Sequence, residues 1–283
     1  MCMGFGCNAA GVIGCRIIDS PRERLIAIIT NNFVPCNGRF PTLIAIITMF
    51  FAGAVGGAFQ SVVSTLALTG VIVLGVAMTV FVSKLLSKTI LKGLPSSFNL
   101  ELPPYRRPQI GKVIVRSIFD RTLFVLRRAV VVAAPAGLVI WALANIQTGG
   151  VSLLAQCAAF LDPFARFIGL DGYILMAFVL GFPANEIVVP IMIMSYMATG
   201  SLVELDSLSD LHALFLANGW TWLTAVCAML FSLMHWPCGT TCFTIKKETQ
   251  SLKWTLVSFA VPTAAGIAAC AVVANGVRLL GLA

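Results

Sequence analysis

The stretch Gly181-Phe182-Pro183-Ala184-Asn185 decides the fold, because it breaks an apolar segment and has a counterpart at Gly4-Phe5-Gly6-Cys7-Asn8. A second motif, Pro35-Cys36-Asn37-Gly38, is likewise repeated as Pro237-Cys238-Gly239. Glycine and proline interrupt helices and free backbone groups, which at membrane depth must face protein, water or a ligand instead of lipid. The paired motifs therefore predict an internal repeat whose breaks mark a permeation site.

The composition is that of a membrane protein. Of the 283 residues, 59% are hydrophobic and 11% are charged, whereas soluble domains carry about 25% charged residues. The mean hydropathy is +0.96. A spanning helix needs about 20 mostly apolar residues, and stretches without Asp, Glu, Lys or Arg at 40–83, 129–161, 211–245 and 254–277 provide them. The sequence predicts an all-α, polytopic membrane protein with about six or seven spans or half-spans.

Basic residues are concentrated in one segment. Residues 84–128 hold ten Lys or Arg against Glu101 and Asp120, and the nine Lys or Arg elsewhere balance nine Asp or Glu. Because membrane spans flank this block, it fits the excess of Lys and Arg in cytoplasmic loops, and its expected partner is anionic lipid instead of nucleic acid. Residues 109–128 mix basic and apolar side chains at the spacing of an amphipathic helix at the membrane surface.

Loop charges also predict how the two motif copies are oriented. The loop between the motifs of the first copy is basic, whereas the loop 200–217 of the second copy carries Glu204, Asp206 and Asp210 without Lys or Arg. By the charge rule the first loop is cytoplasmic and the second is external, so the copies are inverted. Inverted repeats with broken helices are a common transporter architecture, with the substrate site at the midplane.

The same rule limits how often the chain crosses the membrane. Lys246, Lys247 and Lys253 place the loop after residue 245 inside, so only one of the two Pro-broken segments before it crosses fully. We assign 172–199 as re-entrant, 211–245 as the crossing segment, 150–171 as lying along the outer interface and 254–277 as a final outward span.

The cysteines suggest the chemistry of the site. Nine cysteines without a regular pairing pattern are interpreted as thiols. Cys7, Cys36 and Cys238 lie at the predicted breaks, where freed carbonyls could supplement a thiolate, and such a site suits Fe(II), Zn(II) or Cu(I) better than Na⁺ or Mg²⁺. Cys242 would share the face of Cys238 if the helix resumes directly after the break. The alternative for each is the ordinary packing of a buried cysteine.

Four further polar residues accompany the motifs. Glu186 is an ionisable residue at membrane depth, which favours ion coordination or gating, with an ion pair to Arg39 as the alternative. Asn8 and Asn185 are candidates either to donate carbonyl ligands or to cap the broken helix ends. His235 is a candidate metal ligand, or a hydrogen-bond partner of a neighbouring helix.

Several motifs occur in a distinctive order along the whole chain. They are Gly4-Phe5-Gly6-Cys7-Asn8, Arg22-Glu23-Arg24, Glu101-Leu102-Pro103-Pro104-Tyr105, Gly181-Phe182-Pro183-Ala184-Asn185-Glu186 and His235-Trp236-Pro237-Cys238-Gly239-Thr240-Thr241 followed by Lys246-Lys247-Glu248-Thr249. This order resembles the membrane portion of the ferrous iron transport protein B (FeoB) family over essentially the full length.

The resemblance implies two Gate, or nucleoside-recognition, domains around a central segment. We assign 1–60 to the first Gate domain, expected to be truncated at its N-terminus. We assign 61–128 to a transmembrane helix with the basic segment, and 129–283 to an outward span, the second Gate domain and a C-terminal span. In the family, cysteines of the Gate motifs are proposed to line the iron path, which here means Cys7, Cys36 and Cys238.

The implied function is import of Fe(II), as substrate, across a bacterial cytoplasmic membrane. The family carries an N-terminal GTP-binding domain, but the present sequence has no Gly-x-x-x-x-Gly-Lys-Ser/Thr phosphate loop. We therefore expect a transporter, not an enzyme, with GTP binding supplied by a separate subunit or lost. Small accessory Feo proteins and further copies of the chain are expected partners. The alternatives are a Gate-domain transporter of a nucleoside or an anion, and a nonfunctional or regulatory fragment of an iron transporter.

Overall fold

The fold is almost entirely helical. The computed structural model describes residues 2–53, 59–93, 109–116, 124–203, 205 and 207–281. The strands in these ranges are β1 (Gln147–Thr148) and β2 (Val151–Ser152), an antiparallel hairpin turned by Gly149 and Gly150, whose φ angles are 68° and 82°. Such angles favour glycine because it has no Cβ. The prediction of an all-α protein is confirmed.

The helices follow the motifs closely. In chain order they are η1 (Cys2–Phe5), α1 (Asn8–Gly14), η2 (Cys15–Ile17), α2 (Pro21–Thr30), η3 (Asn31–Phe33), α3 (Phe40–Ile47), the π-helical η4 (Thr48–Ala52), α4 (Phe59–Lys88), α5 (Ile110–Arg116), α6 (Phe124–Asn145), α7 (Leu153–Phe167), α8 (Gly172–Leu180), η6 (Asn185–Ile187), α9 (Val188–Met197), α10 (Leu208–Ala217), α11 (Trp222–Met234), α12 (Gly239–Thr249) and α13 (Leu252–Leu279).

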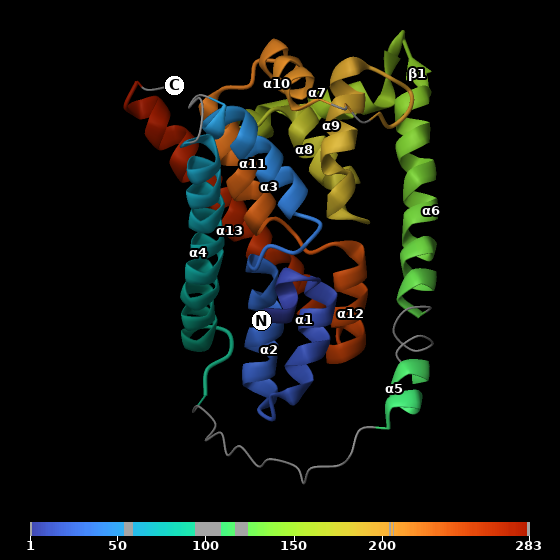
Figure 1. Ribbon diagram of the computed structural model, residues 1–283, viewed down its shortest axis with the longest axis vertical. Helices are drawn as coiled ribbons and strands as arrows, with labels where there is room; N and C mark the ends of the chain where they lie inside the picture. The colour runs from blue at the N-terminus through green and yellow to red at the C-terminus, as the bar shows by residue number, and fades with distance from the viewer. Residues whose placement is uncertain are drawn as a thin grey trace.

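The first repeat passes from one end of the molecule to the other and back. Helix α1 descends from mid-height and α2 returns, so the two form a hairpin in the lower half of Figure 1. After a break at 31–39, α3 continues upward into the upper half. The long helix α4 then runs over most of the height of the bundle back into the lower half.

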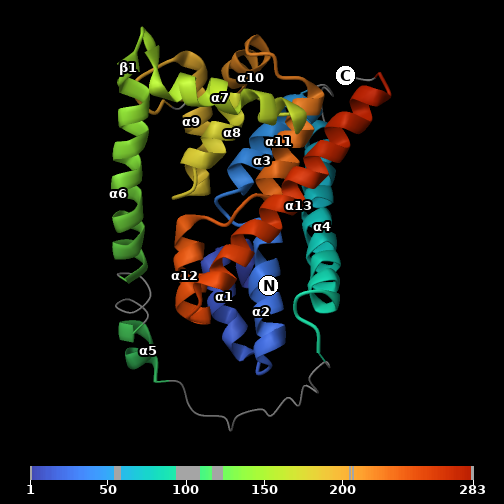
Figure 2. The same ribbon diagram turned by 180° about the vertical axis from the view of Figure 1, so that it is seen from behind.

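The second repeat follows the same course upside down. Helix α8 descends to mid-height and α9 returns beside it, which makes 172–199 a re-entrant segment as predicted (Figure 1). Helix α11 descends from the upper end to a break at 235–238, and α12 continues into the lower half (Figure 2). Helix α13 then returns to the upper end. Thus α1, α2, α3 and α4 correspond to α9, α11, α12 and α13, and the predicted inversion is confirmed.

Local sequence explains where the helices begin. Ser20 accepts a hydrogen bond from the amide of Glu23 at 3.4 Å, and Pro21 occupies the first turn of α2. Asp171 caps α8 by accepting from the amide of Ile174 at 2.7 Å. Side-chain oxygens at these positions replace the carbonyl partners that the first amides of a helix lack.

Three described segments are long and apolar enough to cross a membrane: α4, Trp222–Thr249 and α13. Helices α7 and α8 meet at 109° and would form a fourth if they are counted as one span. Helix α7 lies across the upper end of the bundle, which agrees with the interfacial placement predicted for 150–171 (Figure 1). Shorter apolar helices are Phe40–Ala52, Asn185–Met197, Leu208–Ala217 and the apolar part of α6, Val130–Asn145.

Some predictions fall outside the described residues. These are the Pro-rich part of the basic block at 94–108, the second half of the surface helix at 117–123, and the loop acids Glu204 and Asp206. The described parts of the predicted surface helix 109–128 are α5 and residues 124–128, and the latter already belong to α6. The boundaries proposed for the three domains stay a prediction.

Candidate permeation site

The two Gly-Phe motifs have the same backbone geometry. Cys7 precedes α1 with φ −153° and ψ 125°, and Ala184 precedes η6 with φ −151° and ψ 122°. The residue before each helix is thus Cys7 or Ala184, and neither side chain caps the helix. Asn8 and Asn185 are the first residues inside their helices, so neither acts as the N-cap. Asn8 and Asn185 therefore do not cap these helices, which was one of the two roles predicted for them.

Each Pro-Cys motif is hydrogen-bonded to the Gly-Phe motif of its own copy. The amide of Asn37 donates to the carbonyl of Gly6 at 3.3 Å, and the amide of Gly239 donates to the carbonyl of Phe182 at 2.7 Å. These bonds satisfy backbone groups that the breaks release from the helices. Each copy therefore builds one crossing point from two broken segments.

Polar side chains join the two crossing points to each other. The amide group of Asn185 lies 3.8 Å from Cys36 Sγ and 3.3 Å from His235 Nε2. Asn32 Nδ2 donates to the carbonyl of His235 at 2.6 Å. Asn8 donates within the first copy, either to Asn32 Oδ1 or, in the other amide orientation, to nearby carbonyls. The chain of contacts runs from Cys36 through Asn185 and His235 to Asn32 and Asn8.

His235 is held in one tautomer by backbone carbonyls. Its Nδ1 lies 2.9 Å from the carbonyl of Ser232 and 3.1 Å from that of Phe231, so Nδ1 carries the proton. The neutral ring then presents a lone pair at Nε2. In the structure Asn185 Nδ2 donates to Cys36 Sγ and Asn185 Oδ1 faces His235 Nε2, whereas the opposite amide orientation would let Asn185 donate to that nitrogen. His235 therefore hydrogen-bonds across the helices in this state, with its free nitrogen turned to the same asparagine that contacts Cys36.

Arg39 fixes the two breaks together. Its guanidinium donates to the carbonyls of Asn32 at 2.7 Å and Leu233 at 2.9 Å, and to those of His235 at 3.2 Å and Trp236 at 3.3 Å. The residue is 1% exposed, and its Nε has no hydrogen-bond partner. The predicted alternative of an Arg39–Glu186 ion pair is not among the ion pairs of the described residues. Carbonyls freed by the breaks take the place of a carboxylate.

Glu186 lies at the edge of the site. Its side chain is exposed, and a Cβ placed on Gly38 would stand 3.0 Å from Glu186 Cγ and 3.4 Å from its Oε1. The carboxylate of the second copy therefore packs against the turn that follows Cys36 in the first copy. Gly38 leaves the space that this contact needs.

The cysteines lie around the same level with unequal burial. Cys7 is exposed, Cys36 is buried and Cys238 is half-buried. Cys238 Sγ lies 3.2 Å from Thr241 Oγ1. Cys242 Sγ contacts the freed carbonyl of Pro237 at 3.5 Å.

A compact metal centre is not preformed. Within the ranges that the structure describes, no three His, Cys, Asp or Glu side chains are close enough together to hold a metal ion. The assignment of Cys7, Cys36, Cys238, Glu186, Asn8, Asn185, His235 and Cys242 as metal ligands therefore stays a prediction. The breaks bring the first three cysteines near one another without joining them in one ligand set.

Comparison with known proteins decides the family. Residues 68–120 match the family described as ferrous iron transport protein B C terminus, and residues 126–252 match the Gate family, described as nucleoside recognition. The Fe(2+) transporter FeoB of Staphylococcus aureus strain COL is 31% identical over 270 residues, which cover 93% of this chain and 38% of the relative. The chain belongs to the FeoB family. A FeoB of Methanocaldococcus jannaschii is 30% identical, over 90% of this chain and 37% of the relative.

The chain thus spans well under half the length of these FeoB relatives. A FeoB of Campylobacter jejuni is 25% identical over 90% of this chain and 42% of its own length. No solved structure matches the chain.

Two residues of the FeoB-family site were missed by sequence reasoning. Asn31 and Asn32 lie side by side in the first break and are 1% and 3% exposed. Asn31 Nδ2 donates to the carbonyl of Asn8 at 2.9 Å, while its Oδ1 is buried without a hydrogen-bond partner. A pair of asparagines inside an apolar run was the available signal, because buried amides need partners from elsewhere in the protein.

Gly11 makes room for Asn31, and this predicts the effect of a methyl group. A Cβ at Gly11 would stand 2.4 Å from Asn31 Oδ1, and one at Gly4 would stand 2.9 Å from the same atom. Gly11→Ala is therefore expected to displace Asn31 from the carbonyl of Asn8 and to lower the free energy of unfolding by about 1–3 kcal/mol. Thermal unfolding in detergent measures the change. Gly70→Ala, where a Cβ meets nothing within 4 Å, is the control and should not destabilise.

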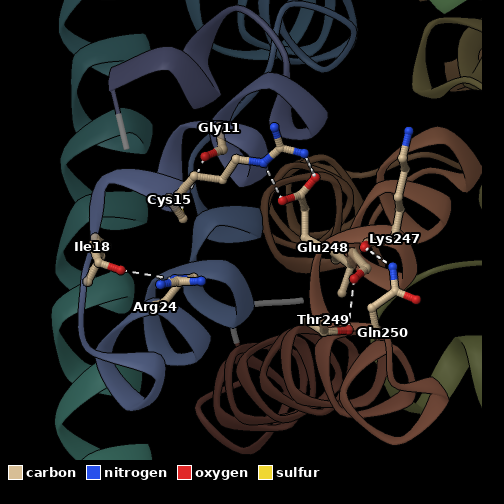
Figure 3. A network of polar contacts seen from close by, with 10 residues as sticks. Gly11, Cys15, Ile18, Arg24, Lys247, Glu248, Thr249 and Gln250 are labelled. Carbon is tan, nitrogen blue, oxygen red and sulfur yellow. Dashed lines mark hydrogen bonds and ion pairs between the residues drawn. The ribbon is translucent and has the colours of Figure 1, made fainter.

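A second connection between the repeats lies at the lower end. Arg16 donates from Nε and a terminal nitrogen to both oxygens of Glu248, each at 2.6 Å, and thereby joins the end of α1 to the end of α12 (Figure 3). The hydrogen bond and the charge of Glu248 raise the pKa of Arg16. Because the Arg16 side chain is 61% exposed, the pair contributes at most about 1 kcal/mol.

Proposed function

We propose that the chain is the membrane permease core of a ferrous iron importer. The proposal is supported by the contacts between the two breaks, in which Asn185 contacts Cys36 and Glu186 packs against the turn at Gly38. The names of the relatives, Fe(2+) transporter FeoB, support the identity of the ion.

The chemistry of these residues suits a transported ion that is held only briefly. Thiolate sulfur is a favourable ligand for Fe(II), and carbonyl and carboxylate oxygens can complete its coordination. Cys7 and Glu186 are exposed, whereas Cys36 is buried. We propose that the ion passes between exposed and buried ligands, with two or three engaged at a time. The absence of a compact ligand set in the described residues is compatible with weak, multi-site binding.

Charge distribution supports inward transport. The lower end of the molecule carries Lys84 and Lys88 at the end of α4 and Lys246 and Lys247 near the end of α12. The excess of basic residues in cytoplasmic loops would place this end inside the cell. Import from the opposite end, through the crossing point, is then the proposed direction.

The chain spans only part of the length of its relatives, and we propose that other polypeptide segments or subunits complete the transporter. A GTP-binding domain, attached elsewhere or encoded as a separate subunit, would supply the nucleotide-dependent step. Small accessory Feo proteins and a second copy of the chain are further proposed partners. A neighbouring reading frame with a Gly-x-x-x-x-Gly-Lys-Ser/Thr loop would support a split transporter.

Uptake of Fe(II) by vesicles containing the chain and its GTP-binding partner tests the site. Cys238→Ser and Glu186→Ala are each expected to reduce uptake on the order of tenfold, because each removes a ligand from a site with few alternatives. Cys157→Ser, in α7 and away from the breaks, is the matched control and should leave uptake unchanged. Unchanged uptake in both site variants would refute the proposed path.

One observation favours a second candidate function, transport of an anion. Arg39 places a fully buried positive charge at the crossing point, bound to carbonyls and not to a carboxylate. A fixed cation attracts anions and repels Fe(II) unless nearby thiols are ionised. Uptake of a labelled anion that is insensitive to Cys238→Ser would favour this candidate over iron.

A further inference from the structure

A long apolar cavity separates α6 from the body of the molecule. Its volume is 740 Å³, and α6 lines it with residue pairs one turn apart: Val131–Val132, Pro135–Ala136 and Val139–Ile140. The opposite wall comes from α8, the second Gly-Phe motif and α12. A one-turn repeat on one face of α6 makes a groove that runs along the helix, so a long ligand would lie parallel to α6.

The cavity extends over most of the thickness of a bilayer. Val132 and Phe182 both lie within 3.4 Å of a Cβ placed on Gly239, which fixes their level at the second break. Eight residues of α6 lead from Val132 to Ile140, and eight residues of α12 lead from Gly239 to Lys247, roughly 12 Å in each direction. Measured along the two helices, the backbones of the lining residues therefore span roughly 24 Å, compared with a hydrocarbon core about 30 Å thick.

Charge occurs at one end of this cavity. Lys247 is the single charged residue among its described lining residues. Figure 3 shows the side chains of Lys247 and Glu248 leaving α12 in different directions, and Glu248 accepts from Arg16. A lysine roughly 12 Å from the midplane can extend its ammonium to the headgroup level of a bilayer. The cavity thus has the pattern of an amphiphile: a long apolar tail with an anionic group at one end.

From this pattern we propose that the cavity is a binding site for an anionic phospholipid of the membrane leaflet at the basic end. One acyl chain runs from Lys247 along α12 to the second break and continues along α6, and the phosphate-containing headgroup contacts Lys247. The tail would touch Phe182 and Pro183 of the second motif, so lipid binding is coupled to the geometry of the crossing point. This site does not depend on the nature of the transported solute.

Native mass spectrometry of the full chain in detergent tests the proposal with phosphatidylglycerol and phosphatidylcholine of identical acyl chains. The wild type should retain phosphatidylglycerol more strongly. Lys247→Glu should weaken its retention about fivefold or more. Lys246→Glu, the same charge change on an exposed neighbour that does not line the cavity, should weaken it less. Equal retention of the two lipids by the wild type, or equal loss in the two variants, would overturn the headgroup assignment.

A second pair of variants tests the acyl-chain part of the site. Ala136→Trp fills the groove between α6 and the body, and it should reduce retention of both lipids severalfold. Ala134→Trp adds the same side chain at an exposed position of α6 outside the cavity and should leave retention unchanged. Retention that is the same in Ala136→Trp and wild type would show that lipid binds elsewhere.

Discussion

Replacing Arg39 by alanine is expected to leave most of the protein unfolded or aggregated in detergent. The substitution removes the guanidinium that donates to the carbonyls of Asn32, Leu233, His235 and Trp236, of which the carbonyl of His235 still accepts from Asn32 Nδ2. Each of the other three carbonyls costs about 1–3 kcal/mol when it is left unsatisfied, so the total is at least about 3 kcal/mol. That is comparable with the whole stability of many domains, about 5–15 kcal/mol. The monodisperse fraction in size-exclusion chromatography and the thermal unfolding midpoint measure it.

Two further variants separate the hydrogen bonds of Arg39 from its charge. Arg39→Lys keeps the charge but offers three donors from one point, so it should recover only part of the stability. Arg166→Ala removes an arginine that is 74% exposed and paired only with Asp162 on the same helix, and should cost less than about 1 kcal/mol. If Arg39→Ala melted within the range of Arg166→Ala, Arg39 would not be the link that holds the breaks together.

Much of the architecture could be predicted because it depends on local rules. Glycine and proline in apolar segments identify the breaks without knowledge of the fold. The charge of its loop predicts the orientation of each copy separately. Because one loop is basic and the other is acidic, the two copies are predicted to be inverted relative to each other. The re-entrant segment 172–199 was predicted from the number of membrane crossings that the loop charges allow. These inferences need only the residues of one segment and its flanks. The structure shows the breaks, the hairpin over 172–199 and the opposite courses of the two copies, whereas the side of the membrane on which each loop lies stays a prediction.

Contacts between the copies could not be predicted in the same way. Asn185 and Cys36 are 149 residues apart, and Asn32 and His235 are 203 residues apart. Motif spacing states which residues lie at similar depth, but it does not state which side chains face each other across the crossing point. The polar pair Asn31–Asn32 was overlooked for this reason, since its partners come from α1 and from the end of α11.

For Arg39, Asn8 and Asn185 the sequence left two roles open, and the local backbone decides between them. An ion pair between Arg39 and Glu186 was reasonable for two charges at membrane depth. The second break instead exposes several carbonyls close to Arg39, and these satisfy the guanidinium without a carboxylate. Capping by Asn8 and Asn185 fails by one residue, because Cys7 and Ala184 occupy the N-cap positions. A shift of one residue in where a helix begins changes the role of an asparagine, and the sequence pattern does not show that shift.

Among glycine-to-alanine substitutions at the described glycines, Gly172→Ala is expected to lower the stability most. A Cβ at Gly172 would stand 2.0 Å from the carbonyl oxygen of Ala158 and 2.8 Å from its carbonyl carbon, so α8 could not keep its close contact with α7. Both atoms belong to the backbone and cannot move aside as a side chain can. The expected loss of free energy of unfolding is about 3 kcal/mol, at the upper end of ordinary overpacking, together with loss of the hydrogen bond from the Gly172 amide to Asp162.

Gly276→Ala in α13, where a Cβ meets nothing within 4 Å, is the matched control and should be neutral or slightly stabilising. Because α7 and α8 support the re-entrant hairpin, Gly172→Ala should also reduce Fe(II) uptake in vesicles. An unchanged unfolding midpoint for Gly172→Ala would mean that α7 and α8 are not packed as closely as their backbone distance requires.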